Sequence, residues 1–127
     1  MQKLRATSRS LSAADEQVDK GRVHIETIRM GDLKVKRQTY PPGWRFSTDM
    51  GEPQCFDTHV GYAVSGHVHV RISNGQELDV RAGDVFVIPP GHDAWTVGDE
   101  DTVLVQFDED ASALERFGVE TPAKAAA

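Results

Sequence analysis

The chain has 127 residues, of which 39% are hydrophobic and 27% are charged, a balance that is typical of a globular protein and argues against a wholly disordered one. A chain of this length is expected to form a single domain. Its formal net charge of -6 argues against nucleic acid as a partner, and no apolar run is long enough to cross a bilayer. The polar residues after the basic start do not resemble a signal peptide, so we expect a cytoplasmic protein that does not bind membranes.

Residues 1–20 are polar and show no hydrophobic period. We interpret them as an N-terminal arm that is partly disordered, with a short helix around Ala13–Asp19 as the alternative. We expect no residue of this arm to carry chemistry.

From residue 21 to residue 110 the sequence changes to short runs rich in Val, Ile, Tyr and Phe, which Gly, Pro and Asn separate. Many short strands at this spacing predict an all-β antiparallel sandwich or barrel. The predicted strands are residues 23–28, 33–40, 55–64, 67–72, 76–80, 84–89, 93–97 and 102–107.

A tight turn is predicted at Ser73–Gln76, because Asn-Gly accepts the positive φ angles of a primed hairpin turn. At the other end of the chain, residues 111–127 contain Leu114 and Phe117 three positions apart. This spacing favours a short helix that lies on the sheet, followed by a flexible tail.

Two histidines stand two positions apart in a predicted strand, and alternation places His67, His69 and Arg71 on the same face of it. The three aliphatic residues of this strand lie on the opposite face, which we therefore expect to pack into the core. A fixed cation beside the histidines would oppose a divalent ion. We therefore interpret the pair as part of a solvated face or a subunit contact, with a weak surface site for nickel or zinc as the alternative.

A second group of ligand-type side chains lies upstream, where the same alternation puts Cys55, Asp57 and His59 on one face of a predicted strand. Further along, His92 directly follows a Pro-Pro-Gly turn that would aim it back toward the sheets. Because Cys55 is the single cysteine, it cannot form an intrachain disulfide, and it is a core residue, a ligand, a nucleophile or an intermolecular crosslink.

The sequence at this point resembles the cupin family. Gly66 matches the glycine that closes the family's first motif, and Gly83, Pro89 and Gly91 match its second motif over a resemblance that covers residues 38–107. The stretches PPGWRFS, HVGYAVSG and VIPPGHDAW together resemble a subgroup of small single-domain bacterial cupins of unassigned function. The resemblance implies a double-stranded β-helix, which is a jelly-roll-like antiparallel barrel, often a homodimer, with any metal held inside.

The usual cupin ligands are absent from their usual positions. His59 stands at the family's glutamate position, Cys55 stands at its second histidine position, and its first histidine has no counterpart. In the second motif the histidine position holds Ala94, and His92 lies two residues earlier.

These residues suggest a rearranged metal site formed by Cys55, His59 and His92 with an open fourth position. One sulfur and two imidazoles suit zinc best, with iron or copper next. Asp57 is the alternative ligand, because two histidines and one carboxylate favour iron(II). The opposing interpretation is a metal-free protein in which the cysteine fills the core, His59 bonds a backbone carbonyl and His92 belongs to a turn.

Four aromatic side chains are expected to line an apolar pocket for a small-molecule ligand, with ordinary core packing as the alternative. They are Trp44, Tyr62, Phe86 and Trp95. Trp95 follows His92 closely, so it is the first choice as a ligand contact.

The sequence favours a single-domain protein that binds a divalent metal, a small molecule or both. The alternatives are a metal-dependent enzyme of the dioxygenase or isomerase type, with Asp57 or Asp93 as acid or base, and a metal-free structural or sensor protein. No dedicated catalytic pair decides between them, so whether the protein is an enzyme stays open.

Overall fold

The computed structural model describes residues 5–108, which form two antiparallel β-sheets and two short helices. None of the helices in that range is long and apolar enough to span a membrane. The elements are η1 (Leu11–Ala13), β1 (Glu16–Lys20), β2 (Val23–Met30), β3 (Leu33–Tyr40), α1 (Phe46–Asp49), β4 (His59–Ser65), β5 (His67–Ile72), β6 (Glu77–Arg81), β7 (Val85–Ile88), β8 (His92–Thr96) and β9 (Thr102–Asp108). The predicted all-β fold is confirmed.

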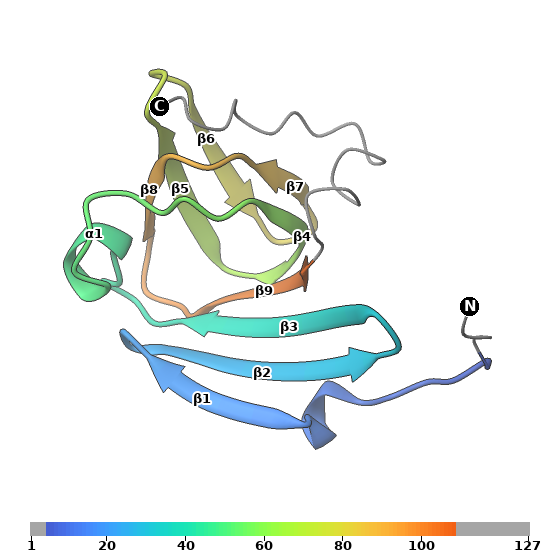
Figure 1. Ribbon diagram of the computed structural model, residues 1–127. Coiled ribbons are helices and arrows are strands. Elements are labelled where there is room, and N and C mark those ends of the chain that lie inside the picture. The colour runs from blue at the N-terminus through green and yellow to red at the C-terminus, as the bar shows by residue number, and fades with distance from the viewer. Residues whose placement is uncertain (1–4, 109–127) are drawn as a thin grey trace.

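The large sheet has the strand order β1-β2-β3-β9-β4-β7, and the small sheet has the order β6-β5-β8. Figure 1 shows β1, β2 and β3 at one end of the molecule and the small sheet at the other. Strands that are neighbours in space are often distant in sequence, as in the pairing of β3 and β4 with β9. This order brings the start of β4, the end of β9 and the β7–β8 turn together.

The hydrophobic core lies between the two sheets and takes side chains from both, as in a β-sandwich. Alternation explains its composition, because β5 buries Val68, Val70 and Ile72 while the residues between them stay partly or fully exposed. The predicted orientation of that strand is confirmed. The core residues are Val23, Tyr40, Trp44, Ala63, Val68, Val70, Ile72, Val80, Phe86, Ile88, Ala94 and Leu104.

Close contact between β4 and β9 depends on Gly61, which pairs with Gln106 across the two strands. A Cβ atom at position 61 would overlap the carbonyl oxygen of Val105 and press on the Phe86 ring. Only glycine at position 61 therefore lets β4 and β9 approach this closely beside Gln106.

The N-terminal arm was wrongly predicted for residues 16–20, which form β1 and pair with β2 along their whole length. The alternative of a helix at Ala13–Asp19 is also wrong, since the only helical turn there is η1. All five residues of β1 are exposed, so no alternation marks the strand. Gly21 and Arg22 both have positive φ angles, 53° and 67°, and the turn that they form brings the polar strand β1 beside β2 at the edge of the sheet.

The hairpin predicted at Ser73–Gln76 is confirmed, but its turn is not of the primed type. The N–H of Gly75 donates to the carbonyl of Ile72 at 2.9 Å, and the Ile72 N–H donates to the carbonyl of Gln76 at 2.8 Å. Among these residues only Gly75 has a positive φ angle, 96°. A three-residue loop with glycine in the left-handed region therefore joins β5 to β6.

The strand predicted at residues 55–64 is confirmed in part, and the C-terminal helix is not tested. The strand predicted at 55–64 is shorter, because β4 begins at His59 and Cys55 forms only an isolated bridge with His92. The predicted helix and tail at 111–127 lie outside the described residues.

Candidate metal centre

Cys55, His59 and His92 each place a ligand atom at one point of the interior, and these three atoms all lie within 4.8 Å of one another. The cysteine comes from the segment before β4, one histidine from the first residue of β4 and the other from the first residue of β8. The residues that the sequence suggested as ligands are thus brought together.

Main-chain hydrogen bonds hold Cys55 and His92 beside each other. The Cys55 N–H donates to the His92 carbonyl at 2.7 Å, and the Cys55 carbonyl accepts from the N–H groups of His92 at 3.1 Å and Gly91 at 2.8 Å. The backbones of the two residues therefore form a bridge with hydrogen bonds in both directions, and this bridge places the thiol beside the imidazole. Their proximity does not depend on the side chains.

The imidazole of His92 has a defined tautomer. Its Nδ1 atom lies 2.8 Å from the carbonyl oxygen of Pro89, and because a carbonyl only accepts, Nδ1 carries the proton and donates it. The side chain is buried, and this burial lowers the pKa of His92. A neutral ring with a protonated Nδ1 carries its lone pair on Nε2, as a metal ligand requires.

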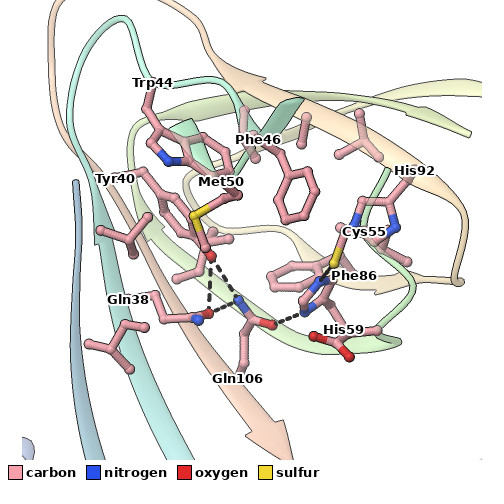
Figure 2. Close-up of a pocket in the computed structure, with 18 residues that line it drawn as sticks. Gln38, Tyr40, Trp44, Phe46, Met50, Cys55, His59, Phe86, His92 and Gln106 are labelled. Carbon is pink, nitrogen blue, oxygen red and sulfur yellow. Dashed lines mark hydrogen bonds between the residues drawn. The ribbon is translucent and has the colours of Figure 1, made fainter. Parts of the chain in front are cut away.

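His59 is held by an amide network that the sequence did not indicate. Its Nδ1 donates to the Oε1 atom of Gln106 at 2.6 Å. The amide nitrogen of Gln106 in turn donates to Oε1 of Gln38 and, at 3.2 Å, to the hydroxyl of Tyr40. With the amide fixed in this way, His59 directs Nε2 toward Cys55, whose Sγ atom is 3.5 Å away (Figure 2).

The sequence carries a faint signal for this network. In the predicted strand 102–107 the inward positions are Thr102, Leu104 and Gln106, so a glutamine occupies a core position among apolar residues. A buried amide needs hydrogen-bond partners, which predicts a polar network there. The identity of the partners, Gln38 and Tyr40, follows only from the pairing of β3 with β9.

The thiol of Cys55 is 7% exposed, and burial raises its pKa. A backbone hydrogen bond from Asp57 acts in the opposite direction and is the smaller effect. Without an ion the thiol therefore stays protonated near neutral pH. A bound divalent cation would displace that proton, because the thiolate is the form that coordinates metals.

An interior cavity of about 120 Å³ adjoins the three ligand-type side chains. Most of its wall is apolar and comes from both sheets (Figure 2). Trp44 and Phe86, two of the four aromatic residues expected at a pocket, are buried and line it.

Tyr62 and Trp95 do not line this cavity, which corrects their expected placement. On β4 the buried neighbours Gly61 and Ala63 point inward, so Tyr62 points outward and is 44% exposed. On β8 the inward positions are likewise the neighbours of Trp95. Alternation along a strand sends residues of opposite parity to opposite faces.

The indole of Trp95 lies on the outer side of the small sheet between two cations. The guanidinium of Arg45 is 4.5 Å from the ring centroid, that of Arg71 is 5.1 Å from it, and the His69 ring is 4.9 Å away. Such an arrangement stabilises the surface through cation–π contacts.

The two acidic candidates take different positions. Asp57 is exposed and contributes to the cavity wall, but it is not part of the three-residue group of ligand atoms. Asp93 instead accepts hydrogen bonds from Arg45 at 2.9 Å and from the backbone and hydroxyl of Ser47 at 3.0 and 2.9 Å. Asp93 therefore fixes the segment around α1 to β8.

The histidine pair on β5 contacts carboxylates of β6. His67 Nε2 lies 2.7 Å from an oxygen of Asp79, and the same oxygen lies 2.9 Å from Nδ1 of His69. The Nε2 atom of His69 is 2.7 Å from Glu77. These contacts form a cross-strand charge ladder on the outer face of the small sheet.

The position of His92 explains how the site departs from the usual cupin pattern. Ala94, at the family's histidine position, and His92 are both buried and both line the cavity. A shift of two residues along a strand keeps a side chain on the same face. The imidazole is thereby displaced along β8 while it still points to the interior.

Residues 36–108 match the sequence model described as Cupin domain. The fold resembles that of the cupin domain of Schizosaccharomyces pombe Cnp3, with 14% identity, a TM-score of 0.59 and coverage of 93% of this chain and 85% of that chain. A Cupin 2 conserved barrel domain protein from Salinispora arenicola gives 18% identity, a TM-score of 0.60 and coverage of 90% and 98%. A protein of unknown function from Rhizobium leguminosarum gives 12% identity and a TM-score of 0.61, with coverage of 82% of this chain and 96% of that chain. No curated protein sequence matches the chain.

Proposed function

This chain belongs to the cupin family, whose model matches more than half of it, and we propose that it binds one divalent metal ion through Cys55, His59 and His92. The observation that carries the proposal is the convergence of their three ligand atoms within 4.8 Å. Both histidines also donate Nδ1–H to a carbonyl-type oxygen, at Gln106 and Pro89. Metal-ligating histidines are held in this way, with the second ring nitrogen on an acceptor.

The donor set favours zinc. One thiolate and two imidazoles are ligands that zinc prefers, and three protein ligands leave a position open for water or a small molecule. Iron and copper are the next choices by the same criterion. A bound ion would supply a Lewis acid beside the interior cavity.

The chain's own residues prepare the centre. Gln106 and Pro89 fix the tautomers of the two imidazoles, and the main-chain bridge sets the distance between Cys55 and His92. The ligand atoms adjoin a mainly apolar wall. A preorganised, partly desolvated site strengthens the interaction of an ion with its ligands.

A metal-dependent enzyme of the dioxygenase or isomerase type is the second candidate, favoured by the cavity of about 120 Å³ next to the ligand group. A redox-responsive thiol sensor is less well supported. Cys55 is buried and its pKa is raised, whereas reactive thiols are accessible and have lowered pKa values.

Elemental analysis of the tag-free, dialysed protein tests the metal proposal. We expect close to one metal ion per chain in the wild type, and its loss in Cys55→Ser, His59→Ala and His92→Ala. The matched control is the double variant His67→Ala/His69→Ala, which removes two histidines from the outer face of the small sheet and retains the metal. A folded wild type that neither carries zinc, iron or copper nor takes them up on addition would refute the proposal, as would loss of metal in the control alone.

A further inference from the structure

We infer that the interior cavity binds a small, uncharged and mainly apolar molecule, and the part of this inference that concerns charge rests on the proposed metal site. The cavity volume is about 120 Å³. A dry apolar cavity of about 150 Å³ in another protein holds benzene. A single small ring or a short aliphatic chain is therefore the largest occupant that fits without movement of the walls.

The charges at the cavity exclude a strongly anionic occupant. No lysine or arginine occurs among the described residues that line it, and the one carboxylate there is Asp57. A divalent ion carries two positive charges, which the Cys55 thiolate and the Asp57 carboxylate together offset. A bound carboxylate would then lose its hydration in an apolar site, and its one cationic partner would be an ion whose charge these two groups already offset, which makes its binding costly.

The polar wall groups do not require hydrogen bonds from a ligand. The hydroxyl of Tyr40 donates to Gln38 at 3.0 Å and accepts from Gln106 at 3.2 Å. Among the described residues no buried side-chain nitrogen or oxygen lacks a hydrogen-bond partner. Recognition is therefore dominated by shape and apolar contact.

Aromatic and aliphatic side chains provide that contact. Figure 2 shows the rings of Trp44, Phe46 and Phe86 around the cavity. Ala94 also lines it and is the smallest of the cavity-lining side chains on β8, beside His92. A larger residue at position 94 would fill the cavity and leave the ligand atoms of the metal site in place.

The test compares two ligands that share one ring and differ in charge. Binding of phenol and of benzoate to the zinc-loaded protein is measured by titration calorimetry at pH 7, and metal content is measured on the same samples. We expect phenol to bind at least tenfold more tightly than benzoate. Ala94→Leu should weaken phenol binding at least tenfold and keep the metal, whereas Ala82→Leu, at an exposed turn, should change neither.

The outcomes separate this inference from the metal proposal. Benzoate binding as tight as phenol binding, or phenol binding that Ala94→Leu leaves unchanged, in protein with normal metal content, overturns the ligand class and leaves the metal site standing. A wild type without metal that still binds phenol overturns the metal proposal and supports the size and polarity of the occupant. Ala94→Val adds less volume and gives the same comparison if Ala94→Leu does not fold.

Discussion

The Oε1 atom of Gln106 on β9 accepts a hydrogen bond of 2.6 Å from Nδ1 of His59 on β4. Through this contact the amide network of the large sheet determines which nitrogen of His59 faces Cys55. Gln106→Leu should therefore lower zinc affinity about 10- to 100-fold, the range found when such supporting contacts are lost. Competition with a chromophoric chelator measures the change.

Gln38→Leu is the control for this prediction. Gln38 accepts from Gln106 and Tyr40 but is not a hydrogen-bond partner of His59, so its loss should reduce zinc affinity less than Gln106→Leu does. Equal losses for the two variants would show that general packing, and not the orientation of His59, determines the affinity.

Burial of His92 predicts a dependence of stability on pH in the metal-free protein. Its folded-state pKa lies below the unfolded value of about 6.5, so the unfolded chain binds the extra proton first as the pH falls. The contribution of the neutral ring is present above about pH 6.5 and is lost as the pH falls toward the folded pKa. Thermal unfolding in EDTA between about pH 7.5 and 5.5 should show a smaller loss of Tm for His92→Gln than for the wild type.

The comparison with His92→Gln is needed because other groups titrate as well, including His69, whose pKa is raised. Their effects are common to both proteins and cancel in the difference. The same slope of Tm against pH in both proteins would mean that His92 is not buried as a neutral ring.

Asp79 should hold the imidazolium form of His69. Hydrogen bonds from His69, first to Asp79 and then to Glu77, raise the pKa of this histidine. Its charged form adds stability below the unfolded pKa, and that stability is lost as the pH rises through the folded one. Asp79→Asn should lower the pKa of His69 in an NMR titration, whereas Asp19→Asn, which removes a carboxylate beside His24, should leave it unchanged.

Gly61→Ala should destabilise the fold by about 3 kcal/mol or more, because the new methyl group meets the backbone of β9 and not a movable side chain. Since Gly61 pairs with Gln106, the variant should also lower zinc affinity. Denaturant unfolding and chelator competition measure the two effects.

Gly75→Ala separates close packing from backbone conformation. A methyl group at position 75 meets open space, but the φ angle of 96° is strained for alanine and costs about 1 to 2 kcal/mol. Zinc affinity should not change. A larger loss of stability at position 75 than at position 61 would contradict the role assigned to the β4–β9 contact.

Period-two alternation predicted β5 correctly because one face of that strand is apolar and the other is charged. It did not place Tyr62, because the outward residues of β4 are larger and more apolar than the inward ones, so hydrophobicity does not distinguish inside from outside on that strand. For the polar strand β1 there was no hydrophobic pattern to read, and its pairing depends on the turn at Gly21 and Arg22.

The three ligand-type residues of the centre were predictable from their chemistry and from the spacing of the cupin motifs. The hydrogen-bond network that orients His59 was not predictable, because its members Gln38, Tyr40 and Gln106 lie on two strands that are far apart in the sequence. Pairing partners in a sheet of this order cannot be inferred from local sequence, which determines strand formation but not strand neighbours.

Cys55 and His92 share main-chain hydrogen bonds in both directions, so the backbone itself places these two side chains beside each other. His59, in contrast, reaches the centre from β4 through its side chain, and the hydrogen bond to Gln106 on β9 orients its ring. One half of the centre is therefore set by the backbone and the other half by a side-chain network. Substitutions in that network would change how tightly a metal is held and leave the bridge between Cys55 and His92 intact.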